Sequence, residues 1–208
     1  MAAWGRREWT EGDLIGGDPV LDFLNTAGGG TRLRDAERLA DFAGFLEWSV
    51  VAGILSGPEA DALSDAAQET PVEADTALAA ARAFREALHA CLMAELSGMA
   101  WPRRGEAMVM DAIRDCLAKA RFDKNGHRYG WSVPATRPDM SIPLLRIILA
   151  TEDLLRRDDL TRLRNCDRCS WLFIDRGRGK ARRWCSMSTC GSRAKSARYY
   201  RRKTARAS

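Results

Sequence analysis

Apolar positions recur at a helical period along most of the first 160 residues. The pattern predicts helices over residues 35–50, 58–68, 73–96, 104–121 and 142–156. The longest of these segments is rich in Ala, Leu, Arg and Glu and contains no Gly or Pro, so helix propensity supports it as well. Pro58 and Pro143 suit a first helical turn, and Ser141 is expected to cap the last helix.

Two segments depart from this helical pattern. Residues 18–26 are short, largely apolar and followed by the glycines Gly28–Gly30, so we expect an early helix or an extended piece that packs on the rest. Residues 128–133 carry aromatic and β-branched side chains, which predict a strand or hairpin. The fold class that follows for residues 1–160 is mainly α, an irregular helical bundle with a small β element.

Charge divides the chain into two unlike parts. Residues 166–208 contain 13 Lys and Arg against two Asp, a net charge of +11, whereas residues 1–165 contain 20 against 26, a net charge of −6. The formal net charge of +5 hides this division. A basic segment attached to an acidic body predicts a polyanionic partner for that segment.

Four of the six cysteines lie in the basic segment at the spacing of a metal site. Two residues separate Cys166 from Cys169, fifteen separate Cys169 from Cys185, and four separate Cys185 from Cys190. Two close pairs can present four thiolates to one tetrahedral ion, so we predict one structural Zn²⁺ held by these residues. Few apolar residues lie between the pairs, so metal binding is expected to supply most of the folding free energy, on the order of 10–16 kcal/mol. Without metal, residues 166–208 are predicted to be unfolded.

Other interpretations of the cysteines are weaker. A redox dithiol at Cys166 and Cys169 lacks the βαβ surroundings of a thioredoxin-like site, and four unrelated thiols would not account for the spacing. Cys91 and Cys116 lie inside predicted helices and are interpreted as small core residues. The chain is therefore predicted to consist of a helical domain, residues 1–160, and a small treble-clef-like zinc finger module, residues 161–208.

A strongly basic segment follows Cys190 and predicts a helix that begins near the second cysteine pair. Its side chains would contact phosphates, and one or two residues near its start would reach base edges in a major groove. A solvated terminal tail is the alternative. The predicted nucleic-acid contacts are Arg182, Arg183, Arg193, Lys195, Arg198, Arg201, Arg202 and Lys203.

The cysteine segments RNCDRCSWLFID (164–175), RRWCSM (182–187) and CGSR (190–193) resemble the zinc finger of bacterial CGNR-type proteins. The segment LDFLNT (21–26) is similar to the opening motif of the ABATE domain that precedes this finger in the same family. The resemblance implies a stress-responsive transcription regulator with a helical, ligand-sensing N-terminal domain and a DNA-binding finger. Ser192 stands where the CGNR signature has asparagine, so base specificity is expected to differ if that asparagine reads a base.

Three polar residues interrupt the apolar segment near the N-terminus. Asp22, Asn25 and Thr26 would either hydrogen-bond nearby helix ends or line a pocket in which a carboxylate and an amide orient a small polar ligand. We keep as a hypothesis that these three residues line a pocket for an unknown small molecule.

An enzymatic role is not expected. Four thiolates close the coordination sphere of a zinc ion, and neither His89 nor His127 belongs to the His-x-Glu motif of a zinc deaminase. The glycines Gly28–Gly30 end without the lysine of a phosphate-binding loop. His127 is expected to be an ordinary surface or core histidine.

The first thirty residues contain no apolar run of a signal peptide, and no stretch is long enough for a bilayer, so the protein is expected to be cytoplasmic with no membrane partner. DNA is the predicted partner, RNA or the ribosome is the main alternative, and a homodimer is left open. A redox-responsive zinc module that binds proteins is a further alternative.

Overall fold

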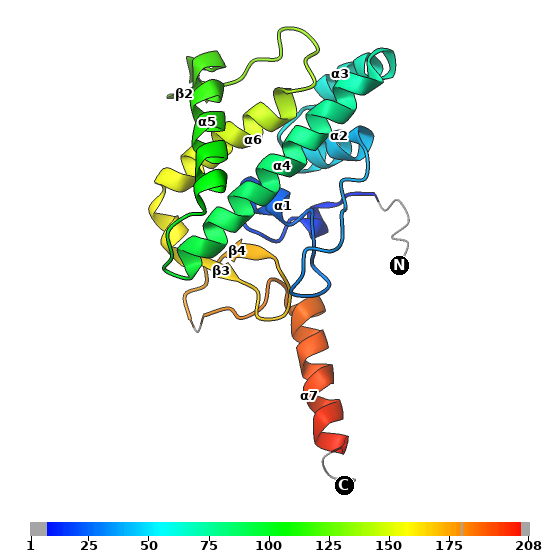
Figure 1. Ribbon diagram of the computed structural model, residues 1–208, viewed down its shortest axis with the longest axis vertical. Helices are drawn as coiled ribbons and strands as arrows, with labels where there is room; N and C mark the ends of the chain where they lie inside the picture. Colours follow the sequence, from blue (N-terminus) through cyan, green and yellow to red (C-terminus); the bar gives the residue numbers. More distant parts are fainter. Residues whose placement is uncertain (1–7, 180, 205–208) are drawn as a thin grey trace.

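The computed structural model describes residues 8–179 and 181–204. It is mainly helical, as the sequence predicts, with two small antiparallel sheets (Figure 1). The helices are α1 Pro19–Leu24, α2 Phe42–Val51, α3 Gly57–Glu69, α4 Pro71–Leu96, α5 Arg103–Lys119, α6 Ile142–Arg156 and α7 Ser192–Thr204. The strands are β1 Arg121–Asn125, β2 Arg128–Ser132, β3 Leu163–Asn165 and β4 Leu172–Ile174. The short turns are η1 Glu11–Asp13, η2 Asp158–Arg162 and the π-helical η3 Met187–Gly191.

One predicted helix start differs clearly from the structure, and one predicted cap lacks its hydrogen bond. The helix predicted over residues 35–50 begins only at Phe42, because the Asp41 side chain accepts a hydrogen bond from the Gly44 N–H at 2.8 Å and caps α2 there. Ser141 occupies the N-cap position of α6, as predicted, but its side chain forms no capping hydrogen bond. Ser141 already has helical backbone angles, and its Oγ donates to Asp139 Oδ1 at 2.7 Å instead.

The loop between α1 and α2 is fixed to α4 by ion pairs. Arg34 pairs with Glu86 at 2.6 Å, and the buried Arg85 donates to both carboxylate oxygens of Glu37 at 2.8 and 2.5 Å. Burial of Arg85 is offset by these charge-assisted bonds, which therefore hold the loop in one conformation. The loop in turn reaches the C-terminal module, since the Ser170 N–H donates to Thr31 O at 3.0 Å.

The short helix α1 lies in the middle of the core. It is capped by Asp18, whose side chain accepts the N–H two residues further on at 2.9 Å, and Pro19 occupies its first turn. The Phe23 ring lies 6.1 Å from the ring of Phe45 and 5.5 Å from that of Trp48, both on α2. Because α1 also contacts α4, α6 and β4, it joins the helical body to the C-terminal sheet.

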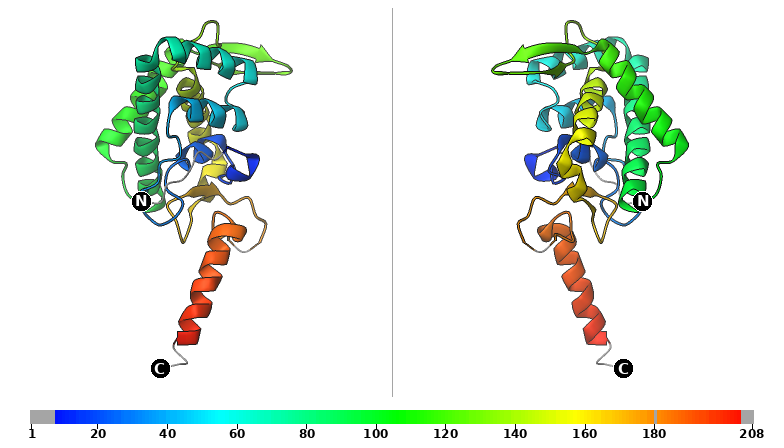
Figure 2. Two further views of the ribbon diagram at one scale, coloured as in Figure 1. Left: turned by 90° about the vertical axis from the view of Figure 1, so that its right-hand side faces the viewer. Right: turned by 90° about the vertical axis from the view of Figure 1, so that its left-hand side faces the viewer.

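The predicted β element is the hairpin β1–β2. Phe122 pairs with Trp131 across the two strands, and Gly126 adopts a positive φ of 59° in the turn. Phe122, Tyr129 and Trp131 are exposed, and the Phe122 ring contacts the rings of the other two. Figure 2 shows this hairpin at the opposite end of the molecule from α7.

The second sheet, β3–β4, attaches the cysteine segment to the body. Leu163, Leu172 and Ile174 are buried within the main core, and Phe173, between them, is buried against the cysteines instead. Alternate residues of β4 therefore pack into two different cores, the main core on one face of the strand and the cysteine cluster on the other. In the part of the chain that the structure describes, no helix is both long and apolar enough to span a bilayer.

Candidate zinc centre and nucleic-acid interface

The four predicted ligands come together in a single buried cluster. Cys166 follows β3, Cys169 lies in the turn before β4, Cys185 precedes η3, and Cys190 lies within it. Their Sγ atoms all lie within 4.8 Å of one another. The Sγ atoms of Cys169 and Cys185 are 3.7 Å apart, close to the edge of about 3.8 Å in a tetrahedron whose Zn–S distance is about 2.3 Å. The donor atoms and their spacing thus fit one Zn²⁺.

The thiols of this cluster are electrostatically coupled. Hydrogen bonds from Cys169 and Cys185 to the Cys166 sulfur hold the pKa of Cys166 far below its usual value. The hydrogen bond to Cys166 raises the pKa of Cys169 to about 12, and hydrogen bonds to Cys166 and Cys169 also raise the pKa of Cys185. Four thiolates in this space therefore need a divalent cation, and metal binding must release protons.

An aromatic and basic layer surrounds the sulfur cluster. The Arg182 guanidinium lies 4.0 Å from the centroid of the buried Phe173 ring and donates to two backbone carbonyls at 3.2 and 3.3 Å. Arg183 pairs with Asp167 at 2.7 Å and lies 5.3 Å from the Trp184 ring. Both arginines, predicted as nucleic-acid contacts, therefore also hold the loops of the module together.

The other predicted contacts belong to α7. This helix extends away from the body, as Figures 1 and 2 show. Its side chains Arg193, Lys195, Arg198, Arg201 and Lys203 are exposed, and none forms an ion pair among the residues described. The backbone of Arg202 belongs to the same helix, but its side chain lies outside the described structure. Tyr199 and Tyr200 are also exposed, at 64% and 65%.

Two family matches together cover most of the chain. Residues 17–158 match ABATE, described as "putative stress-induced transcription regulator", and residues 162–203 match the CGNR zinc finger. The first match covers more than half of the 208 residues. The protein belongs to the ABATE family. Its CGNR finger and its four clustered cysteines together identify one structural zinc ion. No curated protein matches the chain.

The polar residues of the ABATE opening motif face the finger. The Asn25 side-chain amide accepts from the Leu172 N–H at 2.9 Å and donates to the Leu172 carbonyl at 2.8 Å, as a neighbouring strand would. Asp22 Oδ1 accepts from the Gly16 N–H at 2.7 Å, and the Gly16 carbonyl accepts from the Ile174 N–H at 2.9 Å. Both residues therefore fix β4 to the ABATE domain.

Thr26 completes this polar set. Its Oγ1 donates to the Phe23 carbonyl at 2.7 Å and accepts from Arg85 at 2.9 Å. Asp22, Asn25 and Thr26 thus have buried protein partners, and none of them lines any of four cavities found among the described residues. Of the two alternatives for these residues, the geometry therefore favours hydrogen bonds within the protein, which attach the finger, over a ligand pocket.

The sequence did not predict the role of His89 at the same contact. His89 Nε2 lies 3.0 Å from the Ser170 carbonyl, which can only accept, so this nitrogen carries the proton. Burial lowers the pKa of His89 to about 4, so the ring is neutral at pH 7. The only sequence signal was a histidine among the apolar positions of α4.

Arg168 is a second residue that the sequence analysis did not single out for function. Lying between the first two cysteines, it lines a shallow groove of about 500 Å³ with Ser192, Arg193 and Ser196 of α7. Ser192, at the signature position, donates its Oγ to the Met187 carbonyl at 3.2 Å, which helps to join η3 to α7. The groove brings cations from the zinc loop and the helix together beside small hydroxyl groups.

Proposed function

We propose that this ABATE protein regulates transcription by binding duplex DNA through its zinc finger and α7, while the ABATE domain contributes to sensing a small molecule. The single observation that carries the proposal is the exposed, cation-rich helix α7, whose described side chains form no ion pair. At about 1.5 Å per residue, its 13 residues extend for roughly 20 Å. Its start joins the zinc centre through η3.

The energetics of α7 favour an anionic partner. Isolated helices shorter than about 12–15 residues are marginal in water. Lys195, Arg198 and Arg201 are spaced three residues apart, so their side chains are neighbours on the helix surface and their positive charges repel one another. Phosphate groups would neutralise these charges, so DNA binding would stabilise the helix. The acidic ABATE domain would be repelled by the same phosphates, which favours an orientation with α7 against the DNA.

The dimensions favour duplex DNA over duplex RNA. A helix about 10–12 Å across fits the major groove of B-DNA, which is about 12 Å wide. The major groove of A-form RNA is too deep and narrow for side chains to read. With α7 in a major groove, Arg168 and Arg193 would lie near its zinc-proximal end, where phosphate or base contacts are available.

Burial of the sulfur atoms argues against the redox alternative. Cys166, Cys169, Cys185 and Cys190 are at most 3% exposed, whereas redox-sensor cysteines are accessible to the oxidant. Four thiolates also leave zinc no open position for water, so we propose a non-catalytic role. A regulator of this kind would act in the cytoplasm, where its DNA lies.

Binding of the zinc-loaded full chain to labelled duplex DNA, measured by fluorescence anisotropy, tests the proposal. Replacing Arg193, Arg198 and Arg201 together by Gln should lower the affinity roughly 10²-fold at 0.1 M salt, if each side chain neutralises one phosphate. Selection from random duplexes would then define any preferred sequence, and the stoichiometry would report whether one chain or two bind.

A matched variant controls for the loss of charge alone. Arg103, Arg104 and Arg121 are exposed on the ABATE domain, in α5 and at the start of β1. Replacing these three by Gln removes the same charge and should change the affinity by less than about threefold, since interactions beyond about 10 Å are largely screened at 0.1 M salt. Equal losses in the two variants would contradict an interface at α7. Preference for hairpin RNA over duplex DNA would favour the RNA alternative.

A further inference from the structure

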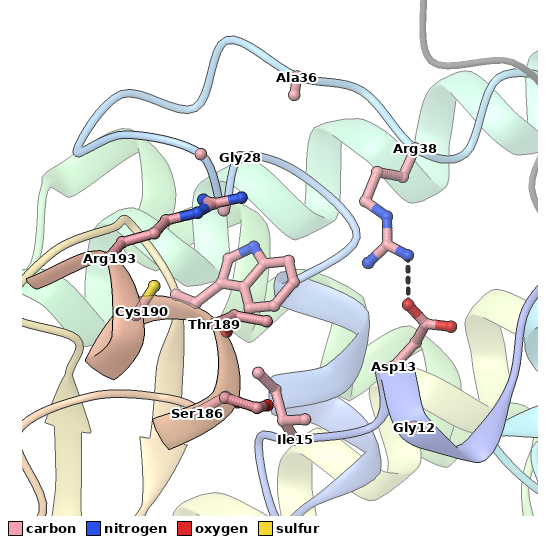
Figure 3. Close-up of a pocket in the computed structure, with 14 residues that line it drawn as sticks. Gly12, Asp13, Ile15, Gly28, Ala36, Arg38, Ser186, Thr189, Cys190 and Arg193 are labelled. Carbon is pink, nitrogen blue, oxygen red and sulfur yellow. Dashed lines mark hydrogen bonds and ion pairs between the residues drawn. The ribbon is translucent and has the colours of Figure 1, made fainter. Parts of the chain in front are cut away.

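A cavity of about 210 Å³ lies between the ABATE domain and the finger. The ABATE side contributes Gly28, Gly29 and Arg38, and the finger contributes Trp171 and Arg193. In Figure 3 the Arg193 side chain points toward Gly28, while Arg38 turns toward Asp13 on the other side of the cavity. Because its walls come from both parts, a bound molecule would contact both at once.

The wall formed by Trp171 is fixed in place. Its indole Nε1 donates to the Ala27 carbonyl at 3.0 Å. Gly29 has a φ of 99°, and a Cβ on this residue would lie only 2.5 Å from the indole ring. The glycine run Gly28–Gly30 therefore does more than follow the apolar segment, because the absence of side chains lets the backbone approach the ring. The cavity thus has a rigid aromatic side.

Two arginines, one carboxylate and the zinc ligand Cys190 line the cavity, and one of the two arginines has no ionic partner in the described part of the chain. Arg38 pairs with Asp13 at 2.7 Å and lies 4.1 Å from the Trp9 ring, so its charge is compensated. Arg193 forms no ion pair or hydrogen bond among the described residues. An anion entering the cavity would therefore find one uncompensated guanidinium beside an indole ring, with the Thr189 hydroxyl also on the wall.

We propose that this cavity binds a small organic carboxylate with a planar apolar group. The carboxylate pairs with Arg193, and the planar group lies against Trp171. The volume of 210 Å³ equals about seven water molecules at roughly 30 Å³ each, which suits a ligand of roughly ten non-hydrogen atoms. An inorganic anion would leave the aromatic wall without a partner, and a neutral aromatic molecule would leave the guanidinium unpaired.

This site deepens the proposed function and rests on it in one respect, the effect on DNA. Arg193 lines both the cavity and the groove beside Arg168. A carboxylate that occupies the Arg193 guanidinium removes it from the phosphates, so the ligand and DNA compete for one side chain. The ligand therefore weakens DNA binding, and DNA weakens ligand binding by the same factor.

Titration of the zinc-loaded full chain with benzoate, followed by calorimetry, tests the site. Benzoate should bind with a Kd of roughly 1 mM or tighter, whereas benzamide and inorganic phosphate should bind at least about tenfold more weakly. Arg193→Gln should weaken benzoate binding at least about tenfold. Lys195→Gln removes the same charge two residues further along α7, outside the cavity lining, and should leave benzoate affinity unchanged. No binding of benzoate at 10 mM, or equal binding by Arg193→Gln, would overturn the proposal.

Adding benzoate to the DNA titration separates this proposal from the proposed function. Saturating benzoate should weaken duplex binding roughly tenfold at 0.1 M salt, the effect of losing about one phosphate contact. If the chain binds benzoate but no DNA, the site stands and the proposed function fails. If it binds DNA but not benzoate, the proposed function stands and the site fails. Binding of both with unchanged DNA affinity would overturn the competition for Arg193.

Discussion

Asp22 is a buried carboxyl at the contact between the ABATE domain and the finger. Burial raises its pKa to about 7, opposed by hydrogen bonds from the Gly16 and Ile15 backbone and assisted by the nearby Asp18. Because the folded-state pKa lies above the ordinary value of 3.8, the folded state favours the protonated acid. The contribution of the protonated Asp22 to the free energy of unfolding is complete below pH 4 and is lost as the pH rises through about 7.

Replacement of Asp22 by Asn should therefore stabilise the protein by an amount that grows with pH. Asn keeps an oxygen that can accept the Gly16 N–H but cannot ionise. The gain in unfolding free energy over wild type should rise from about 2 kcal/mol at pH 5 to about 4 kcal/mol at pH 8. Urea unfolding of both proteins across this range measures it. A difference that does not vary with pH would contradict a buried carboxyl with a raised pKa.

Asn25→Ala tests the attachment of the finger. The change leaves the N–H and carbonyl of Leu172 without their partners in a buried place, which should cost about 2–4 kcal/mol of unfolding free energy. The exposed Gln68→Ala on α3 is the control and should change stability by less than about 0.5 kcal/mol. Unchanged stability of Asn25→Ala with loss of benzoate binding would instead restore Asn25 to a ligand pocket.

At the scale of elements, zinc and the protein core stabilise different parts of the finger. Among the described residues, Phe173 is the one fully buried apolar side chain that packs against the four cysteines. The fold of the residues around η3 therefore depends on the metal. Leu163, Leu172 and Ile174 belong to the main core and do not. The sequence predicted that all of residues 166–208 unfold without metal, but β4 has apolar contacts that metal removal leaves in place.

Chelation of zinc should accordingly unfold only part of the module. Hydrogen exchange should show loss of amide protection in α7 and residues 185–191, while β3 and β4 keep most of theirs. Cys190→Ser, which removes one ligand, should show the same pattern. Loss of protection throughout α1, β3 and β4 on chelation would contradict the division between the two cores. Residues 205–208, the end of the predicted module, lie outside the described residues.

The elements that could be predicted are those set by local pattern. α6 follows its apolar period from Ile142 to Arg156, and the zinc ligands follow from spacing alone. The non-helical loop before α2 could not be predicted, because Arg85 and Glu37, 48 residues apart, hold it in place. The Asp41 cap that begins α2 is, by contrast, a local signal. The cavity could not be predicted from the sequence either, because Gly29 and Trp171 come together only in the folded chain.

At the scale of the whole molecule, the unequal charge has a structural counterpart. The basic helix α7 lies outside the body, so its charge faces away from the acidic ABATE domain (Figure 1). The zinc centre lies between them; β4 and the loop before it are fixed to the body by Asn25 and His89, and η3 joins the zinc centre to α7. Sensing and DNA binding would therefore meet at the finger, which borders both the cavity and the groove.

The salt dependence of duplex binding by the zinc-loaded full chain tests the central claim most directly. If about five phosphates are neutralised, a plot of log K against log salt should have a slope of about −4 to −5. Replacing Arg193, Arg198 and Arg201 by Gln should bring the slope to about −2, since each lost contact removes about 0.9. A wild-type slope near zero, or the same slope in the variant, would contradict an interface built on α7.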